Sequence, residues 1–310
     1  MRLKLSSEQL AIMRSVHNTP RRTQKKMRVL DQQVFRGERA LFHARDLSIH
    51  HGLFEDGESP LKESRDIELY NTMFKWKYPL WYAHHIRLYD CSLFEMARAG
   101  IWYTDDIEMK NTVIEAPKAF RRCDGVRLDR VQFSNAEETL WNCKNVELKD
   151  VFARGNYFAM GSENIDVDGF ELVGNYSFDG CKNVHVKNAK LLSKDAFWNC
   201  ENVVVEDCFI SGEYLGWNSK HLVFKRCIIE SLQGLCYIED LVMDDCKLIH
   251  TTLAFEFVDR VDASISSRID SVKNPISGKI TAHDIGEVIL DADVIDPAKT
   301  TITKLAPASE

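Results

Sequence analysis

Residues 195–208 read DAFWNCENVVVEDC, and two neighbouring stretches nearly repeat them, TLWNCKNVELKD at 139–150 and YLGWNSKHLVFKRC at 214–227. Each stretch has a tryptophan and an asparagine, then a cysteine or serine, and then apolar residues at every second position. Repetition at a fixed period is the sequence signature of a repeat architecture. The period therefore decides the fold class.

We number each repeat from the small residue after the Trp-Asn pair, Cys200 in 195–208, and call this position the anchor. Apolar residues recur three and five positions after the anchor, as at Val203 and Val205. This period of two, without a helical period between repeats, is typical of strands with one buried face. The twelve anchors lie 19 to 21 residues apart and are Ala44, Ser64, Ala83, Thr104, Cys123, Cys143, Ser162, Cys181, Cys200, Ser219, Ile238 and Val258.

Charged residues form two columns that alternate in sign from repeat to repeat. One position after the anchor stand Lys144, Glu163, Lys182, Glu201, Lys220 and Glu239. Six positions after it stand Lys110, Asp129, Lys149, Asp168, Lys187, Glu206, Lys225 and Asp244. Neighbouring strands lie about 4.8 Å apart, where opposite charges attract and like charges repel. The alternation predicts that the repeats stack in parallel and in register.

These patterns predict an all-β fold, a single-stranded right-handed parallel β-helix (a solenoid) of about twelve rungs of 19–21 residues. Asparagine two positions after the anchor suits a tight bend, because it tolerates left-handed φ. A leucine-rich repeat and a left-handed hexapeptide helix are excluded, since their sub-repeats are missing. We expect one β-helix domain over 27–292, with an irregular cap from about residue 265, and a C-terminal tail over 293–310.

Several segments also resemble a known family. They include GERALF at 37–42, KYPLWYAHHIRL at 77–88, KDAFWNCENV at 194–203 and SVKNPISGKI at 271–280. These segments are similar to the DUF3737 family of single-stranded right-handed β-helix, pectin-lyase-like proteins, over roughly residues 28–292. The resemblance implies the fold. It transfers no chemistry, because that family has no established activity or catalytic motif.

Residues 1–26 form a basic N-terminal extension, with seven Lys or Arg residues and a single acid, Glu8. We expect a disordered basic tail. The alternatives are an organelle-targeting segment, against which Glu8 counts, and a stretch upstream of a start at Met27.

Composition narrows the classes of partner and cofactor. The formal net charge of −7 gives no support to nucleic acid or an anionic membrane as a partner. Nine cysteines without a CxxC pair argue against a disulfide framework and against a metal site. No apolar run is long enough to span a membrane, and no nucleotide fingerprint is present. We expect a cytoplasmic protein with no cofactor and no bound metal.

The position two residues before the anchor carries five of the six tryptophans. Its members are Trp81, Trp102, Arg121, Trp141, Met160, Asp179, Trp198, Trp217, Cys236 and Glu256. The position just before it is apolar in almost every repeat and must point inward, so strand alternation turns the tryptophans outward. Three residues before the tryptophan position, the chain places Tyr78, Tyr157, Tyr176 and Tyr214.

An outward row of aromatic rings favours three hypotheses. The first is a carbohydrate-binding face, because flat apolar sugar faces stack on such rings. Its predicted ligand-binding residues are Trp81, Trp102, Arg121, Trp141, Tyr157, Tyr176, Trp198, Tyr214, Trp217 and Glu256. The second is a polysaccharide-active lyase or hydrolase, with Asp179 and Asp195 as its acids. The third is a structural scaffold or homo-oligomer that buries the row as a ladder of rings.

Overall fold

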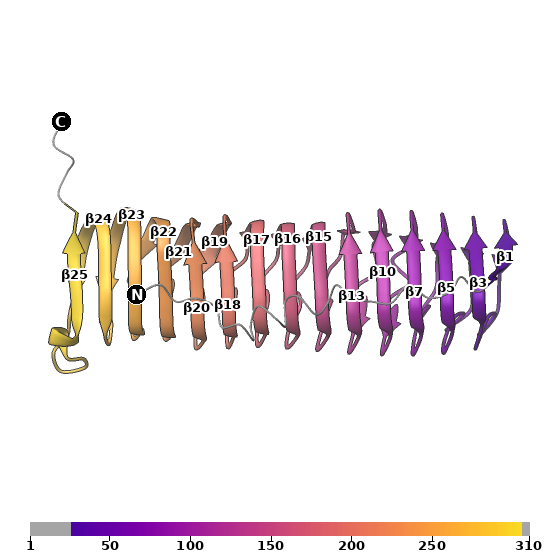
Figure 1. The fold of residues 1–310 in the computed structure, drawn as a ribbon, viewed down its shortest axis with the longest axis horizontal. Helices are drawn as coiled ribbons and strands as arrows, with labels where there is room; N and C mark the ends of the chain where they lie inside the picture. Colours follow the sequence, from indigo (N-terminus) through magenta and orange to yellow (C-terminus); the bar gives the residue numbers. More distant parts are fainter. Residues whose placement is uncertain (1–25, 306–310) are drawn as a thin grey trace, which may run out of the picture.

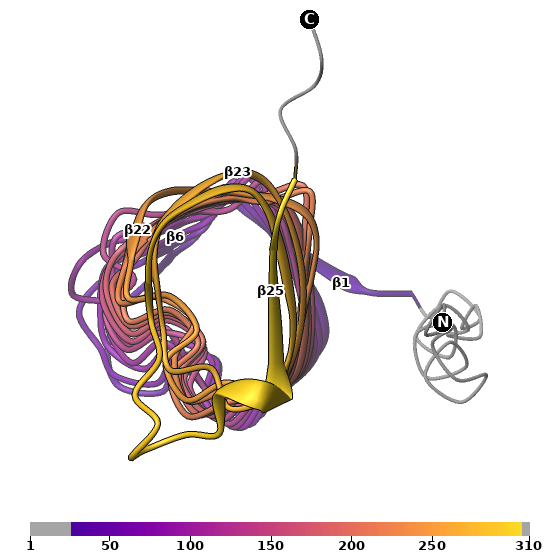
Figure 2. The same ribbon diagram turned by 90° about the vertical axis from the view of Figure 1, so that its left-hand side faces the viewer.

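The computed structural model describes residues 26–305, which form one elongated stack of parallel strands (Figure 1). The predicted extension over 1–26 falls, apart from Lys26, outside the described residues, as does the end of the tail, 306–310. Seen along the long axis, successive turns superimpose around a common centre (Figure 2).

Each turn begins with a main strand that pairs in parallel with the main strand of the next turn. The main strands are β1 (Arg28–Asp31), β3 (Arg45–His50), β5 (Arg65–Tyr70), β7 (His84–Tyr89), β10 (Asp105–Lys110), β13 (Asp124–Asp129), β15 (Lys144–Arg154), β16 (Glu163–Val173), β17 (Lys182–Leu192), β18 (Glu201–Glu206), β20 (Lys220–Lys225), β22 (Glu239–Thr252), β23 (Asp259–Lys273), β24 (Gly278–Ile289) and β25 (Thr300–Lys304).

Shorter strands follow the bend in most turns. They are β2 (Val34–Phe35), β4 (Leu53–Phe54), β6 (Met73–Phe74), β8 (Ser92–Leu93), β11 (Val113–Ile114), β14 (Gln132–Phe133), β19 (Phe209–Glu213) and β21 (Ile228–Leu232). A separate two-stranded sheet pairs β9 (Ile101–Trp102) with β12 (Phe120–Arg121), and the 3₁₀ helix η1 (Pro297–Lys299) precedes β25.

The predicted parallel β-solenoid is confirmed, and it is longer than the twelve predicted rungs, at about 15 turns. One additional turn begins with β1, and two more begin with β24 and β25. Their spacing explains why the repeat pattern missed the last two: Val261 pairs with Gly278, and Gly278 with Thr300. These steps of 17 and 22 residues lie outside the 19–21 period. Stacking also continues past residue 292, the expected end of the domain.

The interior of the tube is filled with the side chains that the alternation placed inward. The residues just before the tryptophan position, such as Leu80, Phe120 and Phe197, are fully buried. All nine cysteines are buried free thiols, and burial raises the pKa of Cys181 to about 12. Burial of all nine is typical of thiols that pack in a core.

Asparagines at the bend connect consecutive turns. Asn145, Asn164, Asn183 and Asn202 all have left-handed backbone, with φ between 53° and 60°. Each side-chain amide donates to the asparagine of the preceding turn over 3.0–3.1 Å, from Asn164 to Asn202. The predicted charge columns also pair as expected, for example Lys182 with Glu201 at 3.4 Å. Bend and charges together fix the register.

Candidate functional site

The first part of the aromatic row is a closed stack of rings. We use the name aromatic row for the residues two positions before the anchor together with the rings that contact them. Trp81 and Trp102 stack with centroids 5.1 Å apart. The Arg121 guanidinium follows, 4.5 Å from the ring of Trp102 and 4.7 Å from that of Trp141. Both faces of Trp102 are thus covered by neighbours in the row, and the row here stabilises the fold.

The indole N–H groups are also used within the fold. Trp102 donates to the carbonyl of Lys118, Trp141 to that of Tyr157 and Trp198 to that of Tyr214, over 2.7–2.9 Å. Each bond reaches a backbone carbonyl in the following turn. The tryptophans consequently lie against the wall, half-buried, with their polar edge turned to the protein.

The C-terminal part of the row is more open. Trp198 and Trp217 are tilted by 32° at a centroid distance of 6.0 Å, so they do not cover each other fully. Tyr214 and Tyr237 beside them are 37% and 40% exposed. Tyr214 contacts Trp217 edge to face, and Tyr237 lies 4.4 Å from the same ring. In this part, therefore, the tryptophans leave ring surface free beside exposed tyrosines.

A line of polar groups runs beside these open rings. Each tryptophan here is followed by an exposed asparagine, Asn199 or Asn218. Asn218 donates to Asn199 and Asn199 donates to Asp179, both over 2.8 Å. This arrangement places Asp179 at the end of an amide ladder, with a carboxylate oxygen held by Asn199.

Asp195, the second predicted acid, occupies a different environment. It is only 8% exposed and lies in the same column as Tyr176 and Tyr214, the positions five before the anchor. Burial raises the pKa of Asp195, and the charge of Glu213 raises it further. Lys194 and a hydrogen bond with Tyr176 oppose that rise. A raised pKa is the direction that a general acid needs, although burial alone also produces it.

Glu256 does not present the exposed carboxylate that the sequence pattern suggested. Its side chain is buried. One carboxylate oxygen lies 2.8 Å from the ammonium of Lys273, and the other accepts a hydrogen bond from the Gln233 amide over 2.7 Å.

The sequence pattern also missed rings in the neighbouring column, one position before the anchor. Tyr82 stacks on Tyr103 at 4.8 Å, and Tyr237 lies 5.2 Å from Phe257. The signal was available, since Tyr82 and Tyr103 each directly follow a tryptophan of the row. Left-handed φ at this column turns these rings to the surface beside the tryptophans.

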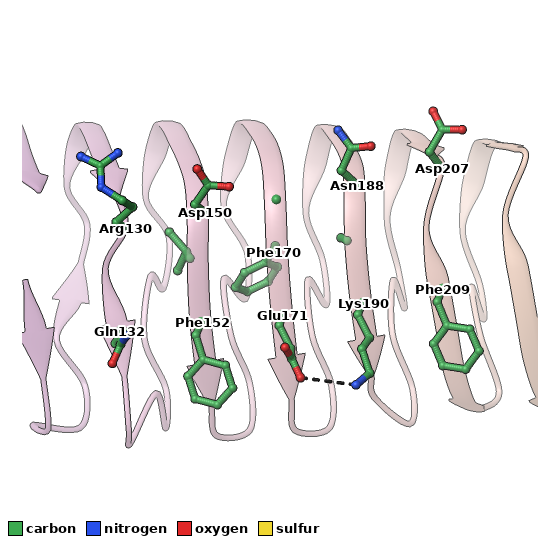
Figure 3. Close-up of a pocket in the computed structure, with 13 residues that line it drawn as sticks. Arg130, Gln132, Asp150, Phe152, Phe170, Glu171, Asn188, Lys190, Asp207 and Phe209 are labelled. Atoms are coloured by element: carbon green, nitrogen blue, oxygen red, sulfur yellow. Dashed lines mark hydrogen bonds and ion pairs between the residues drawn. The ribbon is translucent and has the colours of Figure 1, made fainter. Parts of the chain in front are cut away.

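A groove on another face was not predicted at all. It has a volume of 780 Å³ and extends over five turns, from Arg130 to Phe209 (Figure 3). Phe152 and Phe209 flank the pair Glu171–Lys190, whose charged atoms are 3.4 Å apart. Within residues 26–305, no aromatic ring stacks on either phenylalanine. Gly169 and Ala189 line the middle of the groove, where larger side chains would fill it.

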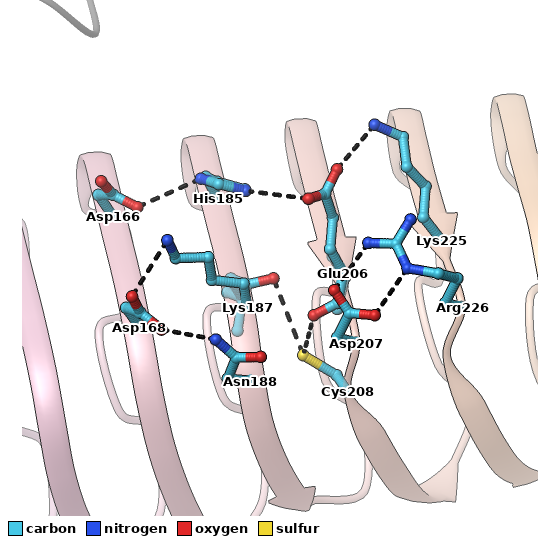
Figure 4. A network of polar contacts seen from close by, with 12 residues as sticks. Asp166, Asp168, His185, Lys187, Asn188, Glu206, Asp207, Cys208, Lys225 and Arg226 are labelled. Carbon is cyan, nitrogen blue, oxygen red and sulfur yellow. Dashed lines mark hydrogen bonds and ion pairs between the residues drawn. The ribbon is translucent and has the colours of Figure 1, made fainter.

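The main-strand face next to the groove carries a network of ion pairs (Figure 4). His185 lies between Asp166 and Glu206, at 3.2 and 3.9 Å. Glu206 also pairs with Lys225 at 2.7 Å, which lowers the pKa of Glu206. These groups form ion pairs across turns, and we assign them to the fold. Among the described residues, no cluster of His, Cys, Asp and Glu side chains has an arrangement that could hold a metal ion, and none of the helical segments meets the length and hydropathy of a membrane span.

Residues 28–303 match the family model described as Protein of unknown function (DUF3737). The chain belongs to the DUF3737 family. The DUF3737 match runs from β1 into β25, so it includes the aromatic row and the groove. No curated protein matches the sequence.

The chain is also similar to several solved structures. A tailspike protein of E. coli bacteriophage HK620 aligns at 8% identity and a TM-score of 0.43, over 89% of this chain and 72% of that one. PfbA, a surface adhesin of Streptococcus pneumoniae, aligns at 11% identity and a TM-score of 0.33, over 78% and 69%. The A-module of an Azotobacter vinelandii mannuronan C-5 epimerase aligns at 10% identity and a TM-score of 0.27, over 91% and 90%.

Proposed function

We propose that this DUF3737 protein binds a carbohydrate-type ligand along the C-terminal part of the aromatic row. One observation carries the proposal: incompletely stacked rings lie directly beside a line of exposed amides. Trp198, Trp217 and Tyr237 supply ring surface, and Asn199 and Asn218 supply donors and acceptors one residue away.

Sugars present the same two kinds of surface. Their C–H faces pack on aromatic rings, and their hydroxyls exchange hydrogen bonds with amides and carboxylates. The spacing between turns is about 4.8 Å, so a linear glycan parallel to the axis meets a new ring and a new amide at each turn. The ring stack from Trp81 to Trp141 offers little such surface, and we assign it to stability.

The groove is a second candidate surface for the same function. Phe152 and Phe209 expose ring surface three turns apart, and Gln132 and Asp150 line the groove beside them. Backbone groups on this wall are paired with the neighbouring strands, which disfavours a peptide that binds by strand addition. Binding here would depend on side chains, as it does for sugars.

Affinity electrophoresis and calorimetry with neutral oligosaccharide panels (cello-, xylo-, manno- and malto-oligosaccharides) test the proposal. We expect the double variant Trp217→Ala/Tyr237→Ala to lose binding and Phe152→Ala/Phe209→Ala to retain it. The reverse result transfers the site to the groove. Trp76→Ala, a tryptophan outside the row, is the matched control.

Failure of the wild type to bind any glycan in these panels or on a glycan array would overturn carbohydrate binding. A dimer that dissociates when Trp217 and Tyr237 are replaced would favour the scaffold hypothesis. For a ligand that binds, product analysis over time decides between a binding protein and an enzyme. Turnover that is lost in Asp195→Asn while binding is kept would support the enzyme.

A further inference from the structure

The first turns break the charge rule that the later turns obey. One position after the anchor, the later turns alternate Lys and Glu, but β3, β5 and β7 begin with Arg45, Arg65 and His84. The register pairs Arg45 with Arg65, and Arg65 with His84. Like charges directly opposite each other on adjacent strands destabilise a sheet. Two arginines in register therefore need a compensating anion.

The protein itself provides little compensation. Among residues 26–305, the Arg65 guanidinium makes no ion pair, and Arg45 donates only to the backbone carbonyls of Ala44 and Glu63. The carboxylate of Glu63 lies at the same place but is held by His43, and this hydrogen bond lowers the pKa of Glu63.

The groups on either side do not change this balance. His84 is 3.3 Å from Asp105 of the following turn, so Asp105 neutralises the histidine when the ring is protonated. The ammonium of Lys62 lies 5.6 Å from the Tyr82 ring and adds another positive charge beside the arginines. The unpaired charge here is positive, on a chain whose net charge is −7.

These side chains surround a hollow on the surface. It has a volume of 310 Å³ and is lined by Arg45, Glu63, Arg65, Tyr82 and His84. Tyr82 is 42% exposed, which leaves its ring available at the rim. The hollow therefore combines two guanidinium forks, an imidazole and a phenol with one carboxylate, that of Glu63, which His43 holds.

We propose that this hollow is an oxyanion-binding site, in which Arg45 and Arg65 hold a phosphate, sulfate or carboxylate group. Guanidinium groups match such oxygens in a bidentate manner, and the bonds are charge-assisted. The site does not require the carbohydrate proposal. The anion can be a free ion or an acidic group on a sugar, since both present the same oxygens to the two arginines. A sugar is a candidate because Tyr82, which lines the hollow, directly follows Trp81 of the aromatic row.

Calorimetric titration of the full-length protein with inorganic phosphate, at constant ionic strength against chloride, tests the site. We expect phosphate to bind, Arg65→Gln to bind it about tenfold more weakly, and Arg154→Gln to bind as the wild type does. Arg154, at the end of β15, is exposed and lines neither the groove nor the hollow. Arg154→Gln therefore removes the same charge at a place away from both.

A stability measurement separates this site from a structural role of Arg65. In phosphate-free buffer, Arg65→Gln should unfold at the same urea concentration as the wild type or a higher one, because a repulsion is removed. Phosphate should raise the Tm of the wild type more than that of Arg65→Gln at the same concentration. A destabilised Arg65→Gln that binds phosphate normally, or no phosphate binding by the wild type, would overturn the proposal.

Dextran sulfate oligosaccharides and neutral dextran oligosaccharides of equal length identify the source of the anion. Sulfated-dextran binding that is lost in Arg65→Gln, and that Tyr82→Ala weakens more than it weakens phosphate binding, supports an acidic sugar that packs on Tyr82. Phosphate binding without sulfate-dependent dextran binding supports a free anion. Failure of the carbohydrate proposal removes only the first of these results.

Discussion

The rings of Trp81 and Trp102 stack one turn apart with their planes only 7° from parallel. The same two residues each donate the indole N–H to a backbone carbonyl, so neither their faces nor their polar edges are free. Tryptophans at the same position of the repeat thus have different roles. Trp81 and Trp102 cover each other, whereas Trp198 and Trp217, tilted by 32°, leave ring surface free.

Replacement of Trp102 by alanine should destabilise the protein by about 3 kcal/mol, since it removes two stacking neighbours and one hydrogen bond. Trp102→Phe keeps a ring in the stack and should cost about 1 kcal/mol. Urea unfolding followed by circular dichroism measures both. Trp76→Ala is the control, and an equal cost for it would argue against a special contribution of the stack.

The asparagine ladder can be tested at Asn183, whose φ is 55°. Asn183→Ala loses the bonds to Asn164 and Asn202 and places alanine in left-handed backbone, for a total of about 2–3 kcal/mol. Asn183→Gly loses the bonds but accepts the backbone, and should be less destabilising by about 1 kcal/mol. Equal unfolding free energies for the two variants would exclude backbone strain as a contributor.

The network of Figure 4 predicts a loss of stability in acid. The neighbouring His185 lowers the pKa of Asp166, and a hydrogen bond from Lys225 lowers the pKa of Glu206. A carboxylate with a lowered pKa stabilises the fold above its ordinary pKa, and this contribution is lost as the pH falls through the folded value. The Tm should therefore decrease as the pH is lowered past about 4.

The matched variant for this pH dependence is Lys225→Met. Without Lys225, the pKa of Glu206 returns toward its ordinary value, so the decrease of Tm between neutral and acidic pH should be smaller. Differential scanning calorimetry across that range provides the comparison. A variant curve parallel to the wild-type curve would mean that Glu206 gains nothing from Lys225.

Asp195 should show the opposite sign. Its pKa is raised by burial, so ionisation destabilises the fold increasingly as the pH rises through the folded value. Asp195→Asn removes that cost and should be more stable than the wild type at pH 7, with no advantage at low pH. Chemical unfolding at both pH values checks the sign. An Asp195→Asn protein that is less stable at pH 7 would show that the carboxylate is stabilising there.

The fold was predictable because its rules are one-dimensional. A column of anchors, alternating charges and bend asparagines each repeat at one period, and neighbours along the axis are neighbours in the pattern. The end turns escaped because the 17- and 22-residue steps around Gly278 break that period. The position that corresponds to Ala44 in the first turn falls in the basic segment, where no small anchor is present.

The site was less predictable, for a different physical reason. The repeat predicts the backbone position of each tryptophan, but the side-chain torsion angles decide whether its ring faces solvent or covers the next ring. Glu256 could not be assigned because it lies in a turn and its partner Lys273 follows 17 residues later, at the end of β23. The groove forms where small residues such as Gly169 lie between larger ones. A missing side chain leaves no motif in the sequence.

The alternating charges give the stack a parity. Loss of one turn, residues 182–200, would bring Glu163 against Glu201 and Asp168 against Glu206, so two seams would become repulsive at once. Loss of two turns, residues 182–219, would instead join Glu163 to Lys220 and Asp168 to Lys225. In this part of the molecule, only the loss or gain of an even number of turns keeps opposite charges next to each other.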